Sequence, residues 1–252
     1  MVSGLQTVVR RHVDLDVTLI EASGALSTDA LPELLAALQS CADECPSSVV
    51  VDLSGCEVES PAALAAIGGV GRAGSALPSV DIVLVAAETV APAVGRLGLG
   101  VFERPGDALA SAARYRSRHQ MVRLDFEPVP GAPAQARDLV RSACQDWDMK
   151  PVAPDVELVA SELVTNTVLY SGTAGTIELI NRDGFLRLRV SDGSGEPPTR
   201  EPVGMPPGGP QTTERGRGLP LVQLLSAAWG YLIDHTGRRK AVWATFTGRP
   251  RR

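Results

Sequence analysis

The chain has 252 residues, of which 44% are hydrophobic and 21% charged, and its formal net charge is -5. This length suits two ordinary domains, and the composition is that of a globular protein. The negative charge argues against a surface that coats nucleic acid. No apolar run approaches the roughly 18 residues that span a bilayer, and charges stand where a signal peptide has its apolar segment. We therefore expect a cytoplasmic protein that contacts neither membrane nor nucleic acid directly.

The first 119 residues alternate strand-like and helix-like segments. Continuous apolar strands separated by helices predict an α/β sheet covered by helices, with parallel strand pairs. Strands are expected over residues 6–13, 17–22, 48–53 and 80–86, and helices over 30–44, 62–74, 90–97 and 107–119.

The pattern changes after residue 120, where two long helices precede paired strands. Helices on one side of a mostly antiparallel sheet predict an α+β two-layer sandwich. Strands are expected over residues 122–126, 176–181, 185–191, 231–234 and 240–247, and helices over 132–147, 155–171 and 219–228. Residues 193–213 are rich in Pro and Gly and form no regular element. The predicted domains are therefore 1–119 and 121–248.

A first motif, S-E-L-V-T-N, lies at residues 161–166 in the second long helix. Glu162 and Asn166 are four residues apart, so they project from one face of a helix that is apolar nearly all round. Burying these polar groups costs free energy unless they gain partners, and a metal ion with a phosphate chain would supply them. Asn166 offers Mg²⁺ an oxygen ligand, and Glu162 is placed as a general base. The alternative is an exposed Glu and Asn without a role.

A second motif, V-S-D-G-S-G, ends a strand at Asp192. A carboxylate at this position can accept a hydrogen bond from an exocyclic amine such as that of adenine. Gly193 and Gly195 would let the backbone approach the ring closely. The alternative is a turn that ends the strand, for which Asp-Gly is a common signal.

A third motif, R-G-R-G-L, precedes a helix. Gly216 and Gly218 at a helix N-terminus would expose backbone N–H groups to an anion, and Arg217 adds a charge suited to a terminal phosphate. The alternative is a glycine-rich helix entry that binds nothing.

In this order the three motifs resemble the Bergerat-type ATP-binding domain of the GHKL superfamily, in the branch of bacterial anti-sigma factor serine/threonine kinases. The resemblance covers residues 122–247 and includes the closing strand R-K-A-V-W-A-T-F. The glycines at 193 and 195 fall one place earlier than in the family's D-x-G-x-G pattern. The resemblance implies that Glu162 is the general base and that Asn166 is the magnesium ligand. It also implies that Asp192 binds the adenine, with Gly193 and Gly195 beside the ring, and that Thr245 contacts the adenine through water. The implied phosphate loop is Gly216, Arg217, Gly218 and Leu219, and residues 193–213 would form a mobile ATP lid.

The run VVVDLSGCEVESPAAL in the first half resembles the STAS domain of anti-sigma factor antagonists. Ser60 matches the serine that accepts phosphate in that family. It precedes Pro61 at an expected helix N-terminus, where a negative charge is favoured. The alternative is that Ser60 only caps the helix.

Together the two resemblances imply a STAS-like domain fused to a kinase that uses ATP and Mg²⁺. The expected reaction is phosphorylation of a serine in a STAS-type antagonist, and the implied partners are that antagonist, a sigma factor, or a second copy of the chain in a homodimer. The alternative hypothesis is a non-catalytic, ATP-dependent binding module in partner switching.

Overall fold

The chain divides into two compact units, Met1–His119 and Gln120–Arg252, which we describe separately. The computed structural model describes residues 5–58, 64, 66–67, 70, 80–87, 99–116, 120–182, 184–198 and 218–247. Within these ranges, no helix combines the length and the apolar character that crossing a membrane requires.

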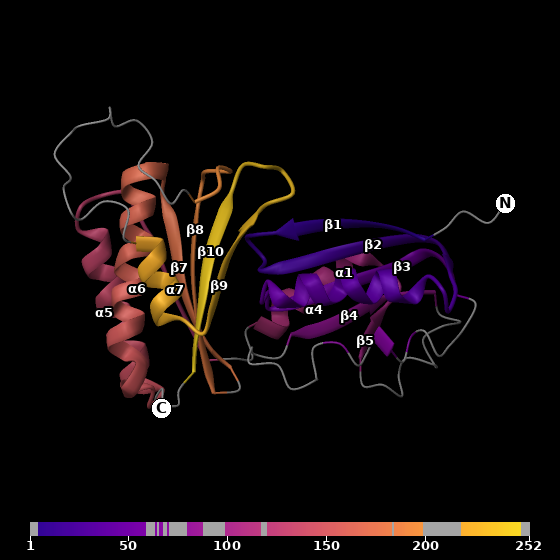
Figure 1. Cartoon of the computed structure of the whole chain (residues 1–252), viewed down its shortest axis with the longest axis horizontal. Helices are drawn as coiled ribbons and strands as arrows, with labels where there is room; N and C mark the ends of the chain where they lie inside the picture. The colour runs from indigo at the N-terminus through magenta and orange to yellow at the C-terminus, as the bar shows by residue number, and fades with distance from the viewer. Residues whose placement is uncertain are drawn as a thin grey trace. The chain divides into compact units, whose positions relative to one another are not determined.

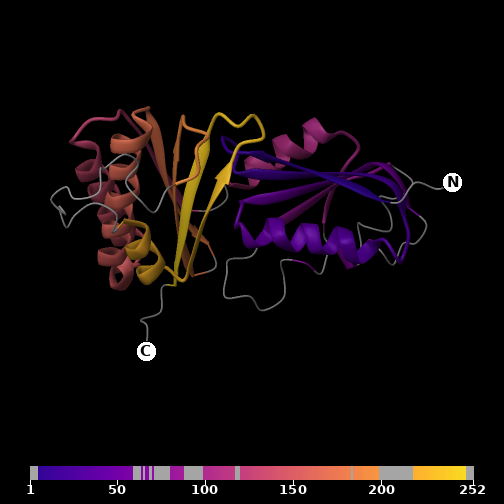
Figure 2. The same cartoon turned by 45° about the horizontal axis from the view of Figure 1, so that its top comes forward.

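The first unit contains a mixed five-stranded sheet of order β1-β2-β3-β4-β5. β1 and β2 are antiparallel, and the following pairs are parallel. Helix α1 packs on one face, where Leu34 and Leu38 contact strand residues, and helix α4 packs on the other through Ala108 and Ala112 (Figure 2). The described elements are β1 Gln6–His12, β2 Val17–Leu26, α1 Leu31–Asp43, β3 Ser48–Val58, β4 Asp81–Val85, β5 Gly100–Phe102 and α4 Pro105–Arg116.

This architecture confirms the expected α/β sheet. The three-residue strand β5 was not expected, because so short a segment shows no periodicity. The helix predicted over 90–97 lies outside the described residues, as does most of the one predicted over 62–74.

The second unit is an antiparallel five-stranded sheet of order β6-β7-β8-β10-β9. Helices α5, α6 and α7 cover one of its faces (Figure 1), which confirms the expected α+β sandwich. The elements are β6 Gln120–Phe126, α5 Ala132–Asp146, the short 3₁₀ helix η1 Lys150–Val152, α6 Ala153–Asn166, the π-helical turn η2 Thr167–Ser171, β7 Gly175–Arg182, β8 Phe185–Asp192, α7 Gly218–Leu225, β9 Ala228–Ile233 and β10 Lys240–Thr247.

Helix α6 lies between α5 and α7 and differs from the expected helix in two respects. The α-helix ends at Asn166 and continues as the wider turn η2, which closes at Gly172 with a left-handed φ of 61°. The helix is also not embedded all round, because Leu158 is 43% exposed. One face of α6 is thus at the surface, and the opposite face packs through residues such as Val159 and Leu163.

The alternation of side chains along β8 and β10 decides which residues face the helices. Leu188 and Val190 on β8, and Val242 and Ala244 on β10, belong to the core beneath the helices. By the two-residue period of a strand, Asp192 and Lys240 therefore point to the same side. These two residues are also direct partners in the strand pairing.

Candidate functional site

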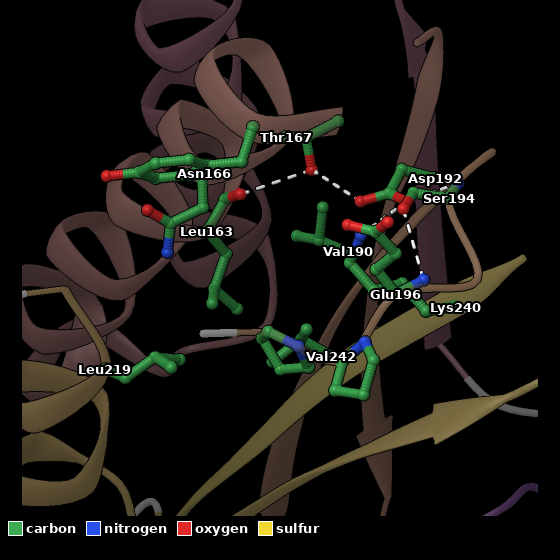
Figure 3. Close-up of a pocket in the computed structure, with 13 residues that line it drawn as sticks. Leu163, Asn166, Thr167, Val190, Asp192, Ser194, Glu196, Leu219, Lys240 and Val242 are labelled. Atoms are coloured by element: carbon green, nitrogen blue, oxygen red, sulfur yellow. Dashed lines mark hydrogen bonds and ion pairs between the residues drawn. The ribbon is translucent and has the colours of Figure 1, made fainter. Parts of the chain in front are cut away.

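A pocket opens on the helical side of the second unit's sheet. It lies between α6, the start of α7, and the ends of β8 and β10 that carry Asp192 and Lys240 (Figure 3). The apolar part of the lining includes Leu163, Val190, Pro197, Pro198, Leu219 and Val242.

Asp192 is the acidic residue at the end of β8, and it is only 3% exposed. Its Oδ1 accepts hydrogen bonds from Lys240 Nζ and from the backbone N–H of Ser194, both at 2.9 Å. Its Oδ2 lies 3.3 Å from the hydroxyl of Thr167. The carboxylate is thus held in one orientation at the pocket wall, where sequence reasoning placed the adenine reader.

Lys240 is a pocket residue that the sequence analysis missed. It opens β10 directly opposite Asp192 and forms a buried ion pair with it. The sequence contains a feature that could have indicated Lys240. The chain has only two lysines among its 24 basic residues, and Lys240 begins a strand that otherwise consists of apolar residues and threonine.

The second polar group of the site is formed by Glu162 and Asn166 of α6 together with Gly218, the first residue of α7. A Cβ atom placed on Gly218 would lie 3.1 Å from Glu162 Oε2 and 3.3 Å from Asn166 Nδ2. Asn166 also lines the pocket. The start of α7 is therefore packed directly against the two polar side chains that the first motif singled out.

Glu162 is half-buried, and desolvation raises the pKa of its carboxyl above the ordinary value. A raised pKa brings a carboxylate closer to the basicity that proton abstraction near neutral pH requires. The environment of Glu162 is thus compatible with the role of a general base.

The two glycines of the second motif have neighbours other than a ligand. The N–H of Gly193 donates to Thr173 Oγ1 at 2.9 Å, and a Cβ on Gly195 would overlap the carbonyl of Gly237 in the β9–β10 turn. Ser194 and Glu196, the residues after each glycine, line the pocket instead. Close packing against protein backbone, and not against a base, therefore explains Gly195.

Thr245 is not brought to the pocket. It is fully buried, and its hydroxyl donates to the carbonyl of Ala228 at 3.3 Å. Because Val242, Ala244 and Phe246 face the helices, the strand period turns Thr245 to the opposite face of the sheet.

Some expected site residues lie outside the described part of the chain. These are Ser60, Gly216 and Arg217, and residues 199–213 of the expected lid. Leu219, the second residue of α7, is described and lines the pocket.

Comparison with known proteins places the second unit in a defined class. Residues 126–246 match the family model of the histidine kinase-like ATPase domain. The second unit is thus similar to ATPase domains of this kind, in agreement with the family that the three motifs resemble. No curated protein matches the chain.

One solved structure similar to this chain is described as the crystal structure of an anti-sigma factor antagonist from Mycobacterium paratuberculosis. It shares 20% sequence identity with this chain, and the alignment covers 43% of this chain and 94% of that chain, with a TM-score of 0.36.

Proposed function

We propose that the second unit is a serine kinase that uses ATP and Mg²⁺ to phosphorylate a STAS-type anti-sigma antagonist. The observation that carries the proposal is the convergence of Glu162, Asn166 and Gly218. Of these three, Asn166 lines a pocket whose wall also contains Asp192. The match of residues 126–246 to the histidine kinase-like ATPase domain supports ATP as the ligand.

The residues of the pocket fit a nucleotide. Val190, Val242 and Leu163 provide apolar surface for a base, and the fixed carboxylate of Asp192 provides an acceptor for an exocyclic amine. The first turn of α7 has backbone N–H groups without partners inside the helix, which is a favourable environment for phosphate. Mg²⁺ prefers oxygen ligands, and the amide oxygen of Asn166 is one that this chain can offer beside that helix start.

In the proposed reaction, ATP would supply the γ-phosphoryl group, and Mg²⁺, held by Asn166, would offset negative charge on the phosphates. Glu162 accepts the proton of the attacking serine hydroxyl. The bond from that oxygen to phosphorus forms while the bond to the β-phosphate oxygen breaks, so that ADP leaves. The helices that carry Asn166 and Gly218, α6 and α7, both pack on the common core of the unit.

We propose a separate STAS-type antagonist as the substrate, with Ser60 of the same or a paired chain as a second possible acceptor. The support is the sequence resemblance of the first half and its mixed sheet with helices on both faces. A sigma factor and a second copy of the chain are the further partners that this assignment implies.

A non-catalytic, ATP-dependent binding module is the second candidate. Two observations favour it: the Asp192 carboxylate is already engaged by Lys240, and Gly195 packs against Gly237. Both observations concern the second motif, whose glycine spacing differs from the family pattern.

The two candidates separate when the full chain is incubated with γ-labelled ATP, Mg²⁺ and purified STAS antagonists. Label on an antagonist serine, lost in Glu162→Ala, is the result expected of the kinase. Nucleotide binding without transfer to any antagonist, or to the chain itself, would establish the binding module. If the chain bound no ATP, both candidates would be excluded.

A further inference from the structure

The ion pair between Lys240 and Asp192 places a buried cation in the wall of the proposed base site. Lys240 Nζ lies 2.9 Å from Asp192 Oδ1, and the lysine is 9% exposed. Both side chains line the pocket (Figure 3). A hydrogen-bond donor and an acceptor thus stand side by side at this wall.

The two carboxylate oxygens of Asp192 are used unequally. Oδ1 accepts from both Lys240 and the N–H of Ser194. Oδ2 is approached by the Thr167 hydroxyl, which lies equally far, 3.3 Å, from the carbonyl of Leu163. A hydroxyl has one proton, so it can bond the Leu163 carbonyl and leave Oδ2 available as an acceptor.

The ammonium of Lys240 has bonding capacity to spare. It carries three N–H donors, and within the described residues its hydrogen bond is to Asp192 Oδ1. A buried charge is stable only when its donors are satisfied, so the others require water or a ligand in the pocket.

We propose that Lys240 is a base-reading residue, whose ammonium donates a hydrogen bond to the ring nitrogen N1 of adenine while Asp192 Oδ2 accepts one from the neighbouring 6-amino group. This inference rests on the proposed nucleotide function and names the specificity of that site. Adenine presents a donor next to an acceptor along this edge, which matches the acceptor and donor of the pair. Guanine presents them in the reverse order, with O6 as acceptor and N1–H as donor.

A purely structural role for Lys240 leads to different expectations. The ion pair would then only neutralise Asp192 and tie β8 to β10. Replacing Lys240 would change stability and overall affinity, but it would not change the preference between ligands that differ only at N1.

The test compares Mg²⁺-ADP with Mg²⁺-1-deaza-ADP, in which a C–H group replaces N1, by calorimetric titration of the full chain. ADP is used because it is not turned over. The variants are Lys240→Met and, as the matched control, Lys150→Met, since Lys150 is the other lysine and is exposed. Mg²⁺-GDP is titrated in parallel.

We expect wild type and Lys150→Met to bind 1-deaza-ADP about tenfold or more weakly than ADP, the loss typical of a charge-assisted hydrogen bond. In Lys240→Met the ratio of the two dissociation constants, 1-deaza-ADP over ADP, should fall below about threefold. GDP should bind wild type more weakly than ADP. Equal affinity of wild type for ADP and 1-deaza-ADP, or the same ratio in Lys240→Met, overturns the role of Lys240 and leaves the proposed function intact. If wild type bound no nucleotide, the proposed function would fail first.

A measurement on the wild-type chain covers the case in which Lys240→Met does not fold. With ¹⁵N at the ζ position of lysine, the chain gives two ammonium signals, because it has two lysines. ADP should shift the Lys240 signal and leave that of Lys150 unchanged, and 1-deaza-ADP should produce a clearly smaller shift. Identical shifts with both nucleotides would contradict the proposal.

Discussion

Gly218 begins helix α7 against the side chain of Glu162, so that a Cβ at position 218 would lie 3.1 Å from Glu162 Oε2. This contact joins two segments that are 56 residues apart in the sequence. It brings the start of a helix, which favours anions, to the carboxylate proposed as the base.

Gly218→Ala should weaken ATP binding about tenfold or more, because the added methyl group displaces Glu162 and Asn166 from the helix start. The contact is with side-chain atoms, so the thermal stability should change little. Isothermal titration with Mg²⁺-ATP measures the effect. Gly106→Ala in α4 is the matched control, because no atom lies within 4 Å of its Cβ position. Unchanged affinity in Gly218→Ala would argue against phosphate at this helix start.

Asn166→Ala should abolish the part of ATP affinity that depends on Mg²⁺. The wild type should bind ATP more tightly with Mg²⁺ than with EDTA, and the variant should bind equally under both conditions. Asn181→Ala serves as control, since the Asn181 amide bonds Gln120 at 2.7 Å and does not line the pocket. A variant that kept the full Mg²⁺ dependence would exclude Asn166 as the ligand.

Glu162→Gln should eliminate phosphoryl transfer while retaining ATP binding, because the amide cannot accept the serine proton. Loss of binding along with transfer would instead indicate a structural role.

The same variant should also change the pH dependence of stability. Burial raises the pKa of Glu162, so the folded state binds its proton more tightly than the unfolded state does. The stabilisation is fully present below the ordinary carboxyl pKa and is lost as the pH rises through the raised value. Glu162→Gln should therefore be more favourable for stability, relative to wild type, at about pH 7 than at about pH 4. Thermal melts of both proteins at the two pH values test this, and an equal difference at both would contradict it.

Gly195→Ala should destabilise the second unit by about 2 kcal/mol or more, because the methyl group would overlap a backbone carbonyl, that of Gly237. All three tryptophans, Trp147, Trp229 and Trp243, belong to this unit, so tryptophan fluorescence in urea reports its unfolding selectively. Gly131→Ala, with no atom within 4 Å of its Cβ position, should change the free energy of unfolding by less than about 0.5 kcal/mol.

The thiols of Cys41 and Cys144 should react slowly with iodoacetamide in the native chain. Both are buried, and desolvation raises the pKa of each to about 11, so little thiolate exists near pH 8. The half-buried Cys56 should react before them. Mass spectrometry of time points in buffer and in urea measures the rates, and equal rates for Cys144 in both would contradict its burial.

Much of the fold could be read from local patterns. The helix expected over 132–147 agrees with α5 within one residue at its end, and the strands expected over 176–181 and 185–191 agree with β7 and β8 within one residue at each end. The four-residue spacing of Glu162 and Asn166 is sufficient by itself to place both on one helix face. These features depend only on the periodicity of residues within one helix or strand, and that periodicity can be seen in the sequence.

The pairing of distant elements was decided only by the tertiary structure. Strand register sets Lys240 opposite Asp192, and the packing of the β9–β10 turn, not a ligand, accounts for Gly195. The face on which Thr245 lies was ambiguous from sequence, because Ala241 and Trp243 are as apolar as Val242 and Ala244. Neither register nor the choice of buried face is a property of one segment, since both follow from which surfaces the folded chain brings into contact.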